Sequence, residues 1–398
     1  MRRLLQINSV ANLGSTGRIA EQLGKKVLAE GWESYIAYGR SAAESSSILT
    51  KIGNKLDLVQ HVCKSRLFDR HGLASKNPTK KLISLIEEIN PEIIHLHNLH
   101  GYYADYHLLL QYLETSKIPT VFTLHDFWWL TGHCAYIHES CEKWKTGCEK
   151  CPRLKTYPAA IFDNSEKNWK LKKKLFDKAS NYTLVPVSHW VDEKLKNSFL
   201  RNLPSKVIYN GIDTGLFFPD LEPSEFLTKD KFNILCVATK WTDQNGFDKI
   251  LALSSILAPD ERIIIVGVDE RQLRSLPSNI LGIKRTENIR ELRKLYSQAN
   301  LLLNPNKEVT FGLVTAEALA CGTPSIVFSD TAGEEIVNND TGFVVDSVAD
   351  IHTVISKLKN MEKKIFLSPC VDRIKENFSL DRQLNAYFDL YTELIERV

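Results

Sequence analysis

RLLQINSVANLGSTGRIAEQLGKKVL, residues 3–28, begins with a short apolar run and ends with an amphipathic one. The run over 3–7 predicts a buried strand, and the apolar spacing over 19–28 predicts a helix. The segment between them contains Gly14 and Gly17, which mark a tight turn. A strand, a glycine-bearing turn and a helix in this order favour an α/β fold with a parallel sheet.

The same alternation continues along the chain and then starts again after residue 230. In the first half, strands are expected over 35–38, 92–97, 120–124 and 182–187, with helices over 82–89 and 106–113. In the second half, strands are expected over 232–237, 262–267, 301–304 and 324–328, with helices over 247–257, 289–298 and 314–320. A last helix over 380–395 has no strand after it.

This pattern predicts two Rossmann-like domains, each a doubly wound parallel sheet. Pro219 and Pro223 interrupt the regular structure where the pattern starts again. We expect a first domain over 1–215, a second over 216–378, and a terminal helix over 379–398 that returns to the first. Ligands of such sheets bind at the carboxyl ends of the strands, so we expect the domains to face a cleft.

Composition and charge narrow the class of protein. With 43% hydrophobic and 25% charged residues, the chain is neither disordered nor a disulfide-dense scaffold. It has no apolar run of roughly 18–20 residues, and its start becomes polar too soon for a signal peptide, so we expect a cytoplasmic protein. Residues 1–220 carry 30 Lys and Arg against 22 Asp and Glu, and residues 221–398 carry 21 against 26. The basic half either faces an anionic surface or reflects ordinary surface composition.

Three groups of residues at expected strand ends could carry chemistry. The turn at Gly14 and Gly17 could expose backbone N–H groups to an anion, although its spacing fits neither a dinucleotide nor a P-loop motif. His125 and Asp126 follow one strand, and His95 and His97 end another; clustered histidines here suggest a site, whereas a lone one would suggest core packing.

The third group is the most specific. Phe311, Gly312 and Leu313 precede a helix expected from Val314, where unpaired N–H groups suit a diphosphate. Glu308 and Glu317 flank this anion site, and carboxylates there can accept hydrogen bonds from sugar hydroxyls. The alternative is an ordinary capped helix with two solvated carboxylates.

Two further clusters suggest binding sites of another kind. Four of the eight cysteines fall within eighteen residues, and the last two have zinc-knuckle spacing: Cys134, Cys141, Cys148 and Cys151. A structural zinc and free thiols are the two interpretations. A lysine-rich helix over 167–178 carries Trp169 and Phe176 and could either form a solvated face or dock on anionic lipid. No nucleic-acid-binding module accompanies these basic residues.

These residues resemble glycosyltransferase family 4, the retaining enzymes of the GT-B fold. The resemblance rests on Asn210-Gly211-Ile212-Asp213, on Glu308 and Glu317 with their helix, and on the segment over 318–324. The segments over 95–103 and 131–136 resemble transferases of bacterial capsule, colanic-acid and O-antigen assembly.

The resemblance implies a role for each candidate residue. It assigns Gly14, Gly17, Gly312, Leu313 and Val314 to the donor pyrophosphate. It assigns Glu317 to ribose hydroxyls, Glu308 to the transferred sugar, His125, with Asp126 beside it, to the reacting sugar, and Phe311 and Ile283 to the donor site. Family members space the two glutamates by seven residues, whereas eight separate them here.

A departure from the family pattern concerns the cations. The family carries a basic residue six positions before a glycine and a lysine directly before it. Here Lys240 stands six positions before Gly246, but Asn245 directly precedes that glycine. An amide can donate hydrogen bonds to phosphate without offsetting its charge, so Lys240 would carry this task.

The resemblance thus implies a retaining transferase that moves a sugar from a UDP- or GDP-sugar to a lipid-linked glycan in surface polysaccharide synthesis. No Asp-x-Asp occurs at a strand end, so no catalytic divalent metal is expected. The rival interpretations are a sugar-nucleotide epimerase of the same fold and a catalytically silent scaffold subunit. Peripheral contact with the inner face of the cell membrane would bring the enzyme to a lipid-linked acceptor.

Overall fold

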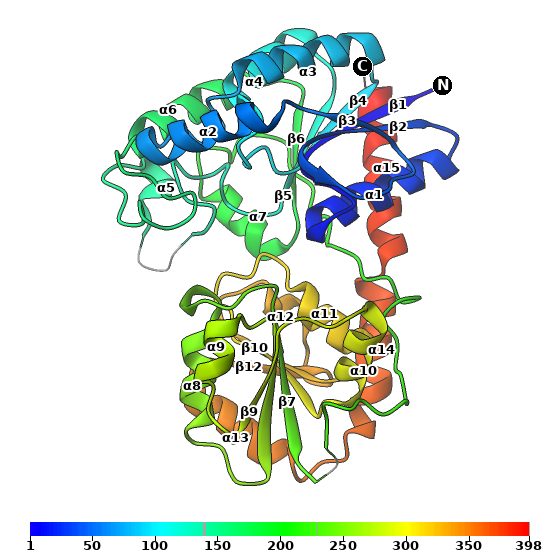
Figure 1. Ribbon diagram of the computed structural model, residues 1–398. Coiled ribbons are helices and arrows are strands. Elements are labelled where there is room, and N and C mark those ends of the chain that lie inside the picture. Colours follow the sequence, from blue (N-terminus) through cyan, green and yellow to red (C-terminus); the bar gives the residue numbers. More distant parts are fainter. Residues whose placement is uncertain (138–140, 229, 398) are drawn as a thin grey trace. The chain divides into compact units, whose positions relative to one another are not determined.

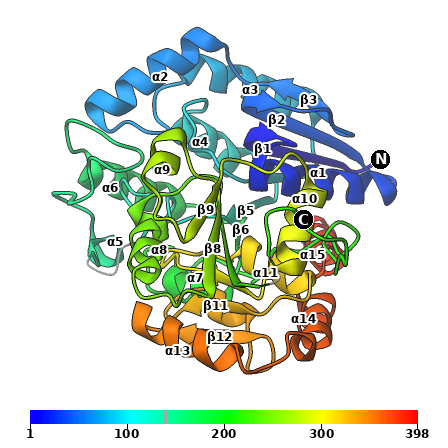
Figure 2. The same cartoon turned by 60° about the horizontal axis from the view of Figure 1, so that its bottom comes forward.

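A computed structural model describes residues 1–137, 141–228 and 230–397. It divides into two compact units (Figures 1 and 2). Unit 1 comprises Met1–Ile208 with Leu384–Val398, and unit 2 comprises Tyr209–Gln383. Each unit contains a six-stranded, fully parallel sheet, so the predicted pair of Rossmann-like, doubly wound domains is confirmed.

The sheet of unit 1 has the order β3-β2-β1-β4-β5-β6. Its strands are β1 (Arg3–Ala11), β2 (Glu33–Ala42), β3 (Ile48–Lys51), β4 (Ile93–Leu96), β5 (Thr120–Leu124) and β6 (Tyr182–Pro186). Its helices are α1 (Gly14–Ala29), α2 (Lys55–Phe68), α3 (Lys76–Ile89), α4 (Tyr106–Ser116), α5 (Lys143–Thr146), α6 (Ser165–Phe176) and α7 (His189–Lys196).

The end of the chain completes the core of unit 1. Helix α15 (Leu380–Glu396) places Tyr387, Leu390 and Tyr391 against α1 and one face of the sheet, where they pack with Leu4 and Val121 (Figure 1). Aromatic side chains dominate the opposite face, where Phe122 contacts Trp129, Phe176 and Tyr182. Burial of these large side chains is the main favourable contribution to the stability of the unit.

The sheet of unit 2 has the order β12-β11-β10-β7-β8-β9. Its strands are β7 (Phe232–Val237), β8 (Glu261–Val266), β9 (Ile280–Ile283), β10 (Leu301–Asn304), β11 (Ser325–Phe328) and β12 (Gly342–Val345). Its helices are η1 (Asp243–Asn245, a 3-10 turn), α8 (Phe247–Ser254), α9 (Glu270–Ser275), α10 (Ile289–Gln298), α11 (Leu313–Ala320), α12 (Gly333–Ile336), α13 (Val348–Leu358) and α14 (Lys364–Asn377).

The predicted strands fall on observed ones, but three edge strands have no counterpart in the sequence prediction. Strands β3, β9 and β12 have four residues each and lie at sheet edges or pair with a single neighbour. Their exposed side leaves no continuous apolar run to detect. In the part of the chain that the structure describes, no helix has the length and apolar character needed to span a membrane.

Candidate active site

The predicted anion site of unit 1 lies where β1 passes into α1. Asn12 and Gly14 both adopt left-handed backbone conformations, with φ of 49° and 62°, and the Asn12 amide donates to the Gly17 carbonyl. A Cβ on Gly17 would lie 3.1 Å from the Val10 side chain, so any larger residue would press on this strand. Leu13 caps α1 without a side-chain hydrogen bond, which leaves the first-turn N–H groups suited to an anion.

A series of hydrogen bonds joins the middle of β1 to the ends of β4 and β5. The Gln6 Nε2 donates to the Ala20 carbonyl at 2.7 Å, and Gln6 Oε1 lies 3.0 Å from His97 Nε2. His97 Nδ1 in turn lies 3.0 Å from His125 Nε2. Since a carbonyl only accepts, Gln6 presents its oxygen to His97, and the hydrogen of that ring is on Nε2. His97 Nδ1 therefore accepts, and His125 Nε2 donates.

The two histidines of this hydrogen-bond series, His97 and His125, are neutral. Burial, followed by the neighbouring His95 and His125, lowers the pKa of His97 well below 6.5. Burial also lowers the pKa of His125 to about 4, against a smaller opposing effect of Asp126. Neutral His125, protonated on Nε2, carries its lone pair on Nδ1, which can accept a hydrogen bond from a hydroxyl group.

His95 forms a second, fully buried layer beneath this hydrogen-bond series. Its Nδ1 lies 2.6 Å from the Tyr391 hydroxyl, and its Nε2 lies 2.7 Å from Thr123 Oγ1, which also contacts the Tyr387 hydroxyl. The His95 and His97 rings lie 3.9 Å apart, so this layer supports the ring above it. Helix α15 thus holds His95 directly, through Tyr391, and supports His97 through the His95 ring.

Asp126 is held beside His125 by its own partners. Its Oδ2 accepts from His100 Nε2 at 2.6 Å, and its Oδ1 accepts from the Trp128 amide at 2.9 Å. Burial opposes ionisation, but His100 and the amide together hold the pKa of Asp126 below its ordinary value. Asp126 is therefore an anion at neutral pH, and sequence analysis did not identify His100 as its partner.

Unit 2 contains the second predicted anion site, at the start of α11. Gly312 caps this helix in a left-handed conformation, with φ of 101°, and no side chain caps its first turn. Phe311 is buried, while Leu313 and Val314 remain partly exposed. The backbone N–H groups of this turn can therefore meet an anion from solvent.

Glu317 lies one turn further along α11 and is held by a buried tyrosine. Its Oε2 accepts from the Tyr296 hydroxyl of α10 at 2.8 Å. Burial and the negative charge of Glu317 raise the pKa of Tyr296 well above 10, so the hydroxyl stays a donor. Tyr296 was not singled out in the sequence, because a helical tyrosine carries no signal that distinguishes support from packing.

Glu308 and Asn304 show how the loop between β10 and α11 is shaped. Asn304 ends β10 and donates to Thr315 Oγ1 of α11 at 3.1 Å. The Glu308 amide donates to Asn306 Oδ1 at 2.8 Å, in a side-chain turn. Glu308 itself is partly buried in this loop. The loop therefore joins the two carboxylates Glu308 and Glu317 to one strand and one helix.

The turn after β7 presents Lys240 and packs on the same loop. Lys240 is exposed, and its carbonyl accepts from Asn245 Nδ2 at 2.6 Å; Asn245 Oδ1 accepts from the Thr242 amide at 2.8 Å. Both ends of the Asn245 amide thus close the turn. A Cβ on Gly246 would lie 2.6 Å from the Pro305 carbonyl, so this turn touches the residue that follows β10.

The donor-site candidate Ile283 ends β9. Ile283 is buried, with its carbonyl accepting from the Gly267 amide at 2.8 Å.

The lysine-rich helix α6 differs from its expected form. Lys172 of α6 is 1% exposed and donates to the Trp128 carbonyl and, at 2.9 Å, to the Thr131 carbonyl. The prediction that this lysine belongs to a surface patch was wrong. Lys172 instead anchors the loop that follows Asp126.

The sequence matches two family profiles. One is described as Glycosyltransferase Family 4 and matches residues 16–216; the other is described as Glycosyl transferases group 1 and matches residues 231–361. The Escherichia coli K12 protein WcaC, a glycosyl transferase assigned to colanic acid biosynthesis, is 24% identical over 98% of this chain and 100% of its own.

Solved structures share the fold. Sucrose-phosphate synthase from Thermosynechococcus elongatus gives a TM-score of 0.72 at 16% identity, covering 100% of both chains. Anabaena HepE, solved with UDP-glucose, gives a TM-score of 0.65 at 12% identity over 99% of this chain and 100% of its own. These likenesses confirm the predicted two-domain fold of GT-B glycosyltransferases.

Proposed function

The chain belongs to glycosyltransferase family 4, and on that premise we propose that it transfers a sugar from a nucleotide-sugar to a glycan acceptor with retention of anomeric configuration. The start of α11, with Glu317 fixed by Tyr296, is the observation that carries the proposal. It combines unpaired N–H groups for a diphosphate with a carboxylate for hydroxyl groups, and a nucleotide-sugar contains both. The solved HepE complexes contain UDP or UDP-glucose, which supports a donor of this class.

The leaving diphosphate gains negative charge as the glycosidic bond breaks. The α11 N-terminus at Gly312, Leu313 and Val314 and the ammonium of Lys240 would stabilise this charge. The fold fixes the helix start before the reaction, so its N–H donors need little reorganisation. A departing diphosphate oxygen would then accept the proton of the acceptor hydroxyl on the same face of the sugar, which accounts for retention.

The residues of unit 1 would act on the sugar. Neutral His125 would accept a hydrogen bond from a sugar hydroxyl at Nδ1, since its Nε2 hydrogen is donated to His97. The anion of Asp126 would offset positive charge that develops on the sugar ring. The first turn of α1, with Gly14 and Gly17, would bind the diphosphate from this unit. In unit 2, Glu308 would contact the transferred sugar, Ile283 and Phe311 the nucleoside.

The relative WcaC supports a proposal for the acceptor and the place of action. WcaC is assigned to colanic acid biosynthesis, and its similarity runs along nearly all of both chains. We therefore propose an acceptor glycan on a lipid carrier, in bacterial surface polysaccharide synthesis. The enzyme would work in the cytoplasm, with exposed lysines of α6 touching anionic lipid at the inner face of the membrane. Lys170 and Lys173 are candidates, although each is paired on its own helix with Glu166 and Asp177.

The test is incubation of the purified chain with a panel of UDP- and GDP-sugars, with and without a crude lipid-linked glycan extract. Transfer or slow donor hydrolysis, detected by mass spectrometry, supports the proposal, and nuclear magnetic resonance of the product establishes the anomeric configuration. Interconversion of free nucleotide-sugars without acceptor would favour an epimerase instead. Donor binding without any turnover across the panel would favour a silent scaffold subunit.

A further inference from the structure

The loop that follows the catalytic candidates of unit 1 is unusually long for its content of regular structure. Between β5 and α6 the described residues form one helix, the four-residue α5. Long loops with little secondary structure of their own are uncommon in compact domains and are usually functional. The loop begins with His125 and Asp126, so whatever fixes it also fixes them.

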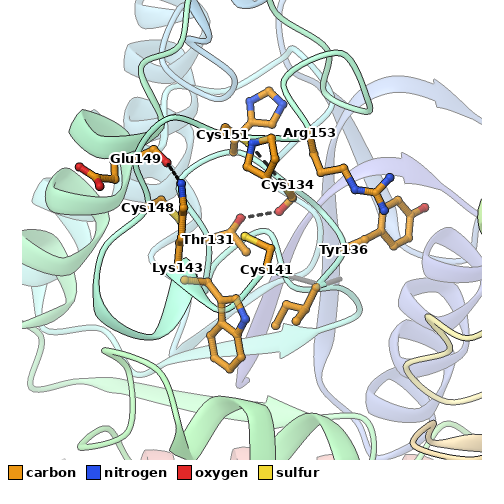
Figure 3. Close-up of a pocket in the computed structure, with 13 residues that line it drawn as sticks. Thr131, Cys134, Tyr136, Cys141, Lys143, Cys148, Glu149, Cys151 and Arg153 are labelled. Carbon is orange, nitrogen blue, oxygen red and sulfur yellow. Dashed lines mark hydrogen bonds between the residues drawn. The ribbon is translucent and has the colours of Figure 1, made fainter. Parts of the chain in front are cut away.

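A pocket in this loop gathers all four cysteines of the predicted cluster (Figure 3). We call it the four-cysteine pocket. Its lining includes the four thiols, one imidazole and two cationic side chains: Cys134, Cys141, Cys148, Cys151, His133, Lys143 and Arg153. Cysteines that lie seventeen residues apart in sequence thus meet in one cavity, which core packing alone would not require.

Two of the thiols already lie at the spacing of metal ligands. Cys134 Sγ and Cys151 Sγ are 3.9 Å apart. Two sulfurs bound to one tetrahedral zinc at about 2.3 Å would lie about 3.8 Å apart. A disulfide, by contrast, requires a bond of about 2.0 Å.

The turn over 148–151 is prepared for thiolate chemistry. The Gly132 amide donates to Cys148 Sγ at 3.2 Å, a contact that favours a sulfur carrying negative charge. Lys150 has a left-handed backbone, with φ of 42°, which tightens the turn. Lys143 Nζ holds it by donating to the Glu149 carbonyl at 2.9 Å and the Lys150 carbonyl at 3.3 Å.

His133 provides an independent sign of an absent anion. Its Nδ1 lies 2.5 Å from Asp69 Oδ1, and both side chains are buried. Its Nε2 is also buried and has no hydrogen-bond partner in the described part of the chain. With Nδ1 paired to the Asp69 carboxylate, an imidazolium would present an Nε2–H that lacks an acceptor, and metal-bound thiolates inside the pocket would be one.

We propose that the four-cysteine pocket binds one zinc ion through Cys134, Cys141, Cys148 and Cys151, with His133 as a positioning residue that faces the thiolates. Binding converts four thiols and Zn²⁺ into a tetrathiolate complex and releases four protons. Lys143, whose Nζ binds the turn over 148–151, would offset part of its negative charge. Within residues 1–137, 141–228 and 230–397, no three His, Cys, Asp or Glu side chains already form a metal centre. Cys141 and Cys148 must therefore turn toward the Cys134–Cys151 pair when zinc binds.

The role of this zinc is structural and separate from sugar transfer. Four thiolates fill a tetrahedral site and leave no position for water or substrate. The ion would close the segment over 134–151 within this loop, directly after Trp128 and Thr131, whose carbonyls Lys172 of α6 binds. It would thereby hold the segment that carries His125 and Asp126.

Metal content of the full chain, purified without chelator or a metal column, is the first test. Near one zinc per chain is expected. Cys134→Ser and Cys151→Ser should each lose most of it, while Cys63→Ser, at an exposed position on α2, should keep it. A zinc-free parent with reactive thiols at all four positions, or a Cys134–Cys151 disulfide found by mass spectrometry, would overturn the proposal.

Cobalt substitution tests the ligand set in the parent protein and does not depend on the folding of variants. Co²⁺ in place of zinc should give the intense sulfur-to-metal absorption and visible bands of tetrahedral tetrathiolate coordination. A spectrum of three thiolates and one imidazole would contradict the set and make His133 a ligand. His133→Ala should leave the spectrum unchanged and weaken metal binding by about 10- to 100-fold. Unchanged affinity in that variant would refute the positioning role.

Discussion

Both units place their candidate binding groups at the carboxyl ends of parallel strands, but the groups differ in kind. In unit 1, beside the helix start at Gly14, the candidate groups are side chains joined by buried hydrogen bonds, from Gln6 through His97 to His125. In unit 2 they are the backbone of a glycine-capped helix, the exposed Lys240, and Glu317 on its tyrosine. The first arrangement fixes a neutral ring in one tautomer, whereas the second supplies charge and N–H groups to a ligand that brings its own negative charge.

This difference shows that the two parts of a nucleotide-sugar, the diphosphate and the sugar, need different binding groups. A diphosphate needs donors and positive charge, which a helix start and a flexible lysine provide without burial. A sugar is neutral, so its recognition requires directed donors and acceptors, which only a buried network can hold in place. We therefore expect changes in unit 2 to affect charge stabilisation most, and changes in unit 1 to have smaller effects that depend on direction.

The largest effect is expected for Lys240→Ala. If its ammonium offsets the charge of the leaving diphosphate, its removal should lower kcat by about 100- to 1,000-fold, as for other transition-state donors. Steady-state transfer assays of both proteins measure it. Lys364→Ala, an exposed lysine of the same unit, is the matched control and should retain parental turnover. Robust transfer by Lys240→Ala would remove Lys240 from the mechanism.

Glu317→Ala should act mainly on donor affinity. Hydrogen bonds to a charged group contribute about 1.5–3 kcal/mol, so the donor Kd should rise by about 10- to 100-fold. Calorimetric titration with a nucleotide-sugar gives this value. Tyr296→Phe, which removes the hydroxyl that holds Glu317, should weaken binding less than the alanine variant does. Equal donor affinity in Glu317→Ala and the parent would contradict the assignment to ribose.

The buried histidines of unit 1 predict a pH dependence of stability. A folded-state pKa below the ordinary 6.5 means that the unfolded chain binds more protons, so stability falls as the pH drops below 6.5. For His97 the linkage relation sets an upper limit of about 2 kcal/mol on the loss between pH 7 and pH 5. Urea unfolding at both pH values should show the loss in the parent and a smaller one in His97→Gln. Identical losses would mean that the ring is not held neutral.

The smallest effect is expected for His125→Ala. A hydrogen bond between neutral groups contributes about 0.5–1.5 kcal/mol, so kcat should fall by about 2- to 10-fold while donor affinity changes less. His125→Asn, which can still accept a hydrogen bond, should recover part of the loss. Turnover equal to that of the parent in a folded His125→Ala protein would make this histidine a packing residue.

The sequence predicted the sheets and the strand ends better than it predicted what supports them. Apolar runs and glycines locate β1, β4, β5 and β10, because burial and left-handed turns impose residue types. Gln6 and Tyr296 escaped notice, since a polar residue in an apolar strand and a tyrosine on a helix become informative only when their partner is known. Gln6 and His97 are ninety-one residues apart in the sequence, and no local sequence pattern predicts a hydrogen bond between them.

Asn245 and Lys172 show a second limit. The sequence places Asn245 where the family has a cation, but the structure uses its amide to close the turn beneath Lys240. Lys172 stands among lysines of similar spacing, yet it alone of Lys170, Lys172 and Lys173 is buried. A charge pattern in the sequence gives the composition of a helix face. Which lysine turns inward depends on carbonyl groups that other segments of the chain leave unpaired.

The packing of α15 on unit 1 has a consequence for biosynthesis. Tyr387 and Tyr391, which complete the layer under the histidines, are translated after every residue of unit 2. The nascent first unit must therefore leave the ribosome with an unfilled apolar groove along α1, and it waits in that state while the second unit folds. Chaperone dependence should thus fall on the half that is made first and should end once α15 has been synthesised and has packed on it.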